Sequence, residues 1–126
     1  RAVRQLQDRF DPHYGGFGAA PKFPMCHNLL FLLRYAARTK NRKVQEMALQ
    51  TLGHMYRGGL FDHIGGGCSR YSTDRRWLIP HFEKMLYDNA LLAYTTLEAF
   101  QMTSRHFFRT MAEHTLHYIL REFPSP

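Results

Sequence analysis

Residues 58–88 read GGLFDHIGGGCSRYSTDRRWLIPHFEKMLYD, and this stretch decides how the chain is organised. It covers about one quarter of the sequence but holds five of the nine glycines, two of the eight histidines and the only tryptophan. Three adjacent glycines, residues 65–67, add no side-chain area to a core and cost backbone entropy on folding, so stability does not explain them. Polar groups gathered around such a turn indicate a functional site.

A helical pattern precedes this stretch. Residues 1–9 have the pattern of the last turns of a helix. Apolar residues recur at helical spacing from residue 25 to residue 39, and again from residue 43 to about residue 57. Gly58 and Gly59 then end the second of these helices. The intervening residues 10–24 contain three glycines and three prolines, so we expect a long loop there.

A second long loop is expected over residues 60–79. Within it, residues 69–73 and 76–79 can pair as a small β-hairpin. Pro80 suits the first turn of a helix, where its missing N–H costs nothing. We therefore expect a helix from Pro80 to about Thr103, with Glu83 near the positive end of its dipole.

Ser104 is expected to cap a last helix over residues 106–122. The connections at residues 40–42 and 103–105 are short, so each pair of helices is expected to form an antiparallel hairpin. Both long loops then lie at the opposite end from the short turns, where a helical array can build a site. The sequence thus predicts an all-α fold of antiparallel helical hairpins, with one small β-hairpin near residues 69–79.

Size and composition indicate a folded domain or a piece of one. The 126 residues are 44% hydrophobic and 14% aromatic, which is enough for a packed core. The chain begins at Arg1 inside a helical pattern and stops at a helix-ending Pro-Ser-Pro sequence. We therefore interpret it as a segment of a longer protein.

Charge, cysteine content and the length of apolar runs indicate which partners and which cellular compartment to expect. The net charge of +7 raises the question of nucleic acid, but no nucleic-acid motif accompanies the basic residues, so a solvated basic surface is favoured. Cys26 and Cys68 form no CxxC pair, a pattern compatible with the reducing cytoplasm. The longest apolar run, residues 29–33, is too short to cross a bilayer. We expect a cytoplasmic protein with no nucleic-acid or membrane partner.

Metal and cofactor motifs are absent from the sequence. It contains no HExxH or CxxC motif, and the glycines at 65–67 lack the spacing of a phosphate-binding fingerprint. No metal and no cofactor are therefore expected.

Asp62 and His63 are the first candidate site residues, because they lie between two glycine groups. A carboxylate next to an imidazole could transfer a proton or orient a sugar hydroxyl. In the alternative interpretation, Asp62 only accepts loop N–H groups and His63 packs over the turn. Both interpretations stay open at this level.

The predicted helix at 80–103 supplies a second set of candidates. His81, Lys84 and Asp88 are spaced at i, i+3 and i+7 and would share one helix face, with Glu83 on an adjacent strip. If this helix packs on several sides, these groups are partly buried and need partners. The alternative is a solvated charged face.

The remaining candidates suit recognition of a ligand. Arg70 offers a fork for a carboxylate or phosphate, while Tyr71 and Trp77 offer flat rings for stacking. In the alternative interpretation, the aromatic rings of the hairpin lie in the core. Asp11 and Lys22, in the first glycine loop, either contact a ligand or only support the loop.

Three strings in the chain resemble a known family. They are GGFGAAPKFP at residues 15–24, GGLFDHIGGGCSRYSTD at 58–74 and WLIPHFEKMLYDNA at 77–90. They resemble the thioredoxin-domain-containing family that includes spermatogenesis-associated protein 20 and many bacterial relatives. The resemblance implies an N-terminal thioredoxin-like domain followed by an (α/α)6 toroid, similar to those of six-hairpin glycosidases and N-acylglucosamine 2-epimerases.

By this resemblance, residues 1–126 are the N-terminal part of the toroid, and the upstream thioredoxin-like domain and the remaining toroid helices lie outside this chain. The resemblance also implies which residues face the central cavity of the toroid: Asp11, Lys22, Asp62, His63, Arg70, Tyr71, Trp77, His81, Glu83, Lys84 and Asp88.

The resulting expectation is a carbohydrate-processing or carbohydrate-binding domain, either glycoside hydrolase-like or sugar epimerase-like. Hydrolysis would use Asp62 and Asp88 as acid and base, with Glu83 as a third carboxylate.

Epimerisation would use His63 and His81 as the acid–base pair, with Arg70 holding the charge of the substrate and the aromatic rings stacking on the sugar. The alternative is a non-catalytic module that binds a ligand or a partner and works with the thioredoxin-like domain.

Overall fold

The computed structural model describes residues 2–18, 25–58, 60–63, 66–69, 71–72, 75–77, 80–81 and 84–122, with only the backbone at 71, 80 and 81. These residues form five helices and two short strands. In chain order they are α1 (Ala2–Arg9), α2 (Cys26–Thr39), α3 (Arg42–Arg57), β1 (Tyr71–Ser72), β2 (Pro80–His81), α4 (Leu86–Thr103) and α5 (His106–Glu122).

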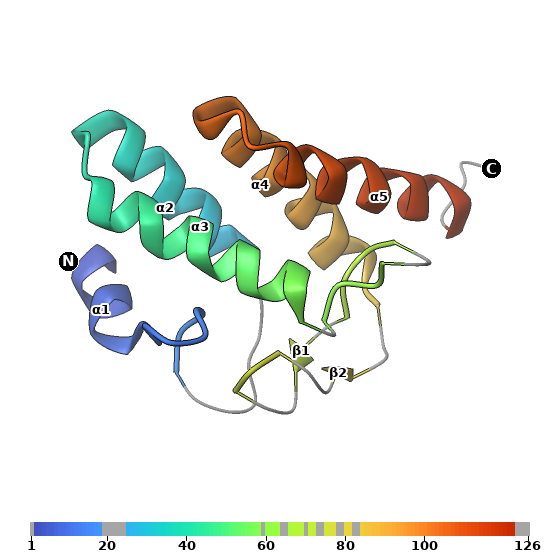
Figure 1. The fold of residues 1–126 in the computed structure, drawn as a ribbon, viewed down its shortest axis with the longest axis horizontal. Helices are drawn as coiled ribbons and strands as arrows, with labels where there is room; N and C mark the ends of the chain where they lie inside the picture. Colours follow the sequence, from blue (N-terminus) through green and yellow to red (C-terminus); the bar gives the residue numbers. More distant parts are fainter. Residues whose placement is uncertain are drawn as a thin grey trace.

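The helices form two layers of antiparallel hairpins (Figure 1). α2 packs against both α3 and α4, α4 packs against α5, and α1 lies against α3. In Figure 1, α3 and α5 lie in front and α2 and α4 lie behind them. The long loops gather at one end of these hairpins, away from the short turns, as the sequence predicts.

Local capping explains the tight turn between α2 and α3. Lys40 takes a left-handed conformation (φ +57°), and its N–H donates to the Ala36 carbonyl. The side chain of Asn41 then accepts the N–H of Val44 at 3.2 Å and caps α3. With two residues between the helices, α3 can only fold back along α2.

The core lies between the two layers and follows the predicted apolar stripes. Its fully buried members from the helices are Leu29, Leu32, Leu33, Val44, Ala48, Leu52, Met55, Leu92, Ala99, Phe108 and Met111. Because the predicted helical stripes of α2 and α3 are the buried ones, the periodicity argument is confirmed for this hairpin.

The start of α4 differs from the prediction. Pro80 does not begin the helix; Pro80 and His81 form β2, which pairs antiparallel with β1 in the register Tyr71 with His81 and Ser72 with Pro80. The β-hairpin is therefore confirmed, but its second strand lies beyond the predicted residues 76–79. Proline is equally compatible with the first turn of a helix and with the start of an edge strand, and pairing with β1 decides between them.

This shift changes the interpretation of three candidate residues. α4 begins at Leu86, so Lys84 precedes the helix and the predicted common helix face of His81, Lys84 and Asp88 is wrong. Asp88 instead occupies the first turn of α4, next to the positive end of the helix dipole.

Ser104 also differs from its predicted role. It takes a left-handed conformation (φ +58°) and ends α4, donating its N–H to the Phe100 carbonyl at 2.7 Å. The expected cap on the last helix is therefore replaced by a C-terminal cap on the preceding one.

Candidate functional site

A tight glycine turn organises the second loop. The Asp62 N–H donates to the Gly67 carbonyl and the Gly66 N–H donates to the Asp62 carbonyl, each at 2.8 Å. Gly66 and Gly67 have φ values of +84° and +77°, which side-chain-bearing residues rarely adopt. A Cβ atom at Gly67 would also come within 2.8 Å of the Tyr118 ring. The glycines therefore allow the turn to lie directly against α5.

Lys84 holds this turn from the side of α4. Its ammonium donates to Asp62 Oδ2 at 2.7 Å and to the Gly66 carbonyl at 3.0 Å. It also lies 4.7 Å from the centre of the buried Tyr118 ring, a cation–π distance. One cation thus joins the glycine turn to α5.

Asn89 makes a second connection between the loop and α4. Its side chain is fully buried, accepts the Cys68 N–H at 2.7 Å, and donates to the carbonyls of Cys68 at 3.2 Å and Met85 at 2.9 Å. Each side-chain polar atom has a partner, so burial of this amide is not penalised. Asn89 therefore fixes where the chain leaves the turn relative to the start of α4.

Asp88 acts electrostatically on two buried thiols. Cys26 and Cys68 are both free and buried, and burial is the main cause that raises their pKa values, that of Cys68 to about 12. The charge of Asp88 raises the pKa of both thiols further, while the Lys84 ammonium acts in the opposite direction on Cys68. We call Asp62, Lys84, Asp88 and Asn89 the loop-end cluster.

His63 contacts aromatic residues outside this cluster. Its Nε2 contacts the Tyr56 carbonyl, and its ring packs edge-on against Tyr56 and Phe61, with centroid distances of 4.6 Å and 5.2 Å. Asp62 and His63 are neighbours in sequence, but their side chains serve different contacts.

Asp11 forms the principal contact between the two loops. Only 5% of the residue is exposed, and its carboxylate binds Arg75 through two hydrogen bonds, Nε to Oδ2 at 2.6 Å and Nη2 to Oδ1 at 3.0 Å. It also accepts the N–H groups of His13 and Tyr14 at 3.0 Å and 3.1 Å. Asp11 therefore holds the first loop closed and attaches it to the segment after β1.

Trp77 is buried in the core beneath the same contact. Its ring is fully buried, and its Nε1 donates to the Tyr14 carbonyl at 2.8 Å. Because protein surrounds the ring, it presents no face for stacking on a ligand here. The core interpretation of Trp77 is the one that the geometry supports.

The remaining candidates lie outside the described residues. This holds for Lys22, Arg70 and Glu83 and for the side chains of Tyr71 and His81. Of the candidates that the structure describes, Asp62 and Lys84 form an ion pair, Asp88 occupies the first turn of α4, and Asp11, His63 and Trp77 make separate contacts.

Sequence reasoning did not single out Asn89 and Tyr118. Asn89 directly follows Asp88, the last residue of the stretch at 58–88 that indicates a site. Tyr118 lies on a helix far from this stretch, and no motif around it in the sequence indicates a site.

The described part of the chain has neither a metal-binding cluster nor a membrane-spanning helix. Among these residues, no three or more His, Cys, Asp or Glu side chains are arranged so that they could hold a metal ion. No described helix has both the length and the apolar character needed to span a membrane.

Comparison with known proteins identifies relatives. No protein-family profile matches the chain. Over 125 residues, 96% of the chain, it is 46% identical to spermatogenesis-associated protein 20 of Rattus norvegicus and equally to that of Homo sapiens. The chain is homologous to part of spermatogenesis-associated protein 20. It spans 16% of the length of each of these relatives.

A protein of Caenorhabditis elegans gives a similar match. It is 48% identical over 103 residues, which are 79% of this chain and 14% of the nematode protein. The resemblance inferred from the three sequence strings is therefore confirmed for the region that this chain covers.

Solved structures show the fold. A sugar epimerase from a ruminal bacterium superposes with a TM-score of 0.81 at 15% identity, over 99% of this chain and 37% of the epimerase. Cellobiose 2-epimerase from Spirochaeta thermophila gives a TM-score of 0.79 at 20% identity, over 95% of this chain and 32% of that enzyme. The predicted helical-toroid fold is confirmed.

Proposed function

We propose that this chain is the N-terminal part of a carbohydrate-processing toroid domain, closest in chemistry to the sugar epimerases. The observation that carries the proposal is the loop-end cluster, where the Asp62–Lys84 ion pair and the carboxylate of Asp88 in the first turn of α4 lie at the loop end of an epimerase-like helical array. The remaining toroid helices would come from further hairpins of the same protein, and the ligand would be a sugar.

Epimerisation requires proton transfer rather than net oxidation. A base removes a proton from the sugar carbon next to a carbonyl, and an acid returns a proton to the opposite face. Asp88 is our candidate base, because the first turn of α4 stabilises its carboxylate. His81 is our candidate acid, on its sequence position next to the cluster.

Lys84 and Asp62 would serve this reaction by positioning. Their ion pair fixes the glycine turn and leaves little net charge on the two groups together. A glycoside hydrolase would use Asp62 and Asp88 directly as acid and base. The epimerase-like assignment is preferred because the two solved structures compared above are epimerases and because Asp62 already binds Lys84.

Calorimetric titration of the intact protein with neutral, acidic and N-acetylated sugars tests the proposal. We expect saturable binding of at least one sugar, weakened about tenfold or more by Asp88→Asn. The matched control is Asp8→Asn on the exposed face of α1, which should leave binding unchanged. If the folded protein binds none of these sugars, the carbohydrate assignment is wrong.

A non-catalytic module is the second candidate. It is favoured by the contacts of Asp11, His63 and Trp77, which all hold the loops in place. In this case the loop end would bind a partner next to the thioredoxin-like domain. Absence of sugar binding, together with altered thiol–disulfide activity of the intact protein in a Lys84→Met variant, would support it.

A further inference from the structure

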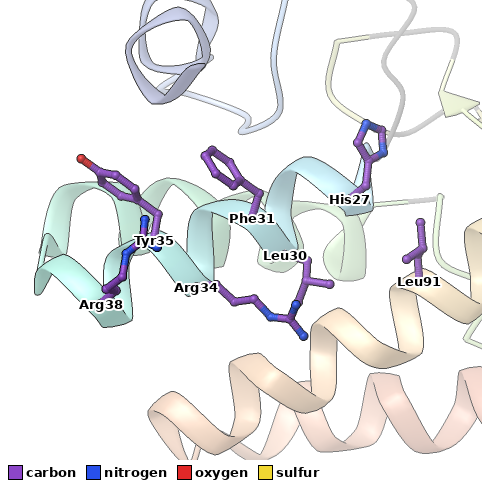
Figure 2. Close-up of a pocket in the computed structure, with 7 residues that line it drawn as sticks. All are labelled: His27, Leu30, Phe31, Arg34, Tyr35, Arg38 and Leu91. Atoms are coloured by element: carbon purple, nitrogen blue, oxygen red, sulfur yellow. The ribbon is translucent and has the colours of Figure 1, made fainter. Parts of the chain in front are cut away.

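A groove separate from the loop-end cluster runs along α2 beside α4. Its volume is about 290 Å³, near the lower end of the range for small-molecule sites. Six of its lining residues come from α2 and one from α4: His27, Leu30, Phe31, Arg34, Tyr35, Arg38 and Leu91. Figure 2 shows Arg34 reaching toward α4, with Phe31 and Tyr35 on another flank of α2.

The lining combines apolar and cationic groups. Leu30 and Leu91 supply aliphatic surface, and the rings of Phe31 and Tyr35 lie 6.3 Å apart. Three basic residues, and no acidic one, line the groove. This composition suits a compact ligand with an apolar face and a negative charge.

Arg34 retains donors for such a ligand. Its Nε and Nη2 bind Glu98 Oε1 at 3.2 Å and 2.9 Å, and Nη2 also donates to the Tyr94 hydroxyl at 2.9 Å. A guanidinium has five N–H groups, so both N–H groups of Nη1 have no acceptor among the described residues. Glu98 therefore fixes the guanidinium in place without using all of its donors.

Arg38 adds a second cation four residues further along α2. Its side chain is exposed, and no described acidic residue pairs with it. Arg34 and Arg38 are one turn apart on α2, so the groove has two guanidinium groups along its length.

The groove begins close to the loop-end cluster. His27 lies in the first turn of α2, next to Cys26, and Leu91 lies one turn after Asp88 on α4. The Thr95 hydroxyl of α4 donates to the Cys26 carbonyl at 3.4 Å, so the start of α2 lies against α4.

We propose that this groove binds the anionic group of a sugar substrate, either a carboxylate or a phosphate, through Arg34 and Arg38, with the sugar ring against the apolar side chains of the lining. The proposal rests on the proposed function, since it assigns a substrate class to the same domain through a groove outside the loop-end cluster. Arginine recognises both anions through paired N–H donors, and aromatic rings pack against the C–H face of a sugar.

Calorimetry on the intact protein tests this proposal with three probes: glucose, glucuronate and glucose 6-phosphate. We expect at least one anionic sugar to bind tenfold or more tightly than glucose. Arg38→Gln should remove most of that preference and leave glucose binding unchanged. The stronger of the two anionic probes identifies the preferred anion.

Two further variants make the test specific. Arg34→Gln should act like Arg38→Gln, whereas Arg4→Gln, at an exposed arginine of α1, is the matched control and should have no effect. Equal losses in the control would show non-specific charge attraction and would overturn the proposal.

The outcomes separate this proposal from the proposed function. If neutral sugars bind as tightly as anionic ones and Arg38→Gln changes neither, the groove assignment is wrong while the carbohydrate function stands. If no sugar binds to the folded protein, both are wrong.

Discussion

At the scale of single residues, the glycine turn shows how backbone conformation and packing act together. Gly66 lies so close to the His114 carbonyl that a methyl group has no space, and its φ of +84° is also unfavourable for alanine. Gly18 has a comparable φ of +93°, but among the described residues a Cβ there would meet only the end of the Arg9 side chain, at 3.4 Å. Comparing alanine substitutions at Gly66 and Gly18 therefore separates the effect of steric contact from that of backbone strain.

We predict that Gly66→Ala lowers the free energy of unfolding by about 3 kcal/mol, and Gly18→Ala by only about 1 kcal/mol, because both add strain but only the first adds a backbone clash. Urea unfolding of the two variants of the intact protein measures the difference. Equal losses would mean that backbone strain, not contact with α5, requires glycine at position 66.

Because the thiols are buried, we expect the free energy of unfolding to depend on pH in the alkaline range. The pKa of Cys68 is about 12 in the folded chain, against an ordinary value of 9.0, so the unfolded state loses its proton first as pH rises. The contribution of the protonated, buried thiol to the free energy of unfolding is fully present below pH 9. It is lost as pH rises toward 12, and the free energy of unfolding then falls by about 1.4 kcal/mol per pH unit per thiol.

Cys68→Ala should therefore reduce the steepness of this alkaline loss, whatever it does to stability at neutral pH. The measurement is the free energy of unfolding from pH 8 to 11 for the intact protein and the variant. An identical slope in both would show that Cys68 is accessible or already ionised.

At the scale of structural elements, the loop between α3 and α4 is held by a few polar contacts rather than by regular structure. Lys84 contacts Asp62, the Gly66 carbonyl and Tyr118, so a single side chain connects the start of α4, the glycine turn and α5. The hydrogen bonds of Asn89 reinforce this connection from within α4.

We predict that Lys84→Met raises amide hydrogen exchange in the glycine turn by about tenfold, because it removes two charge-assisted contacts worth roughly 1–2 kcal/mol together. Exchange mass spectrometry on the peptide covering residues 60–69 checks this. Lys43→Met, at an exposed site on α3, is the matched control. Unchanged hydrogen exchange in the Lys84 variant would show that this lysine does not stabilise the glycine turn.

The β2 segment shows why the start of α4 could not be predicted from the sequence. Residues 80–90 look like a continuous helix start, because Pro80 and the following apolar residues satisfy every local rule. The pairing of β2 with β1 consumes residues 80 and 81, and α4 begins six residues later than predicted. Only a contact with a distant segment could reveal this.

At the scale of the whole molecule, the two-layer array leaves apolar side chains uncovered. Leu97 of α4 and Leu116 and Leu120 of α5 are 40%, 39% and 70% exposed. The superposed epimerases are about three times as long as the region matched here. This agrees with our proposal that further hairpins of the toroid pack on this face.

We predict that Leu120→Asn destabilises the intact protein by about 2 kcal/mol, because packing of the next hairpin would bury this leucine. Ala37→Asn, at an exposed site on α2, should change the free energy of unfolding by less than about 0.5 kcal/mol. Thermal and urea unfolding provide the comparison. An equally small effect of both substitutions would show that Leu120 stays exposed in the intact protein.

Much of this architecture could be predicted from local pattern. The stripe of Leu29, Leu32 and Leu33 marks the buried face of α2, and the polar connection at 40–42 marks a helical hairpin, because both depend on residues close in sequence. The glycine-rich stretch also marked the loop where the cluster lies. These features need no knowledge of distant contacts.

The tertiary structure alone decided which candidates meet. Asp62 pairs with Lys84 across 22 residues, Asp11 pairs with Arg75 across 64, and Trp77 is buried under the first loop. Side-chain direction in a glycine-rich loop is set by the surfaces that the loop packs against, and those surfaces belong to helices far away in sequence. The sequence by itself thus determined the helical hairpins and the place of the site, while packing determined which side chains face one another within it.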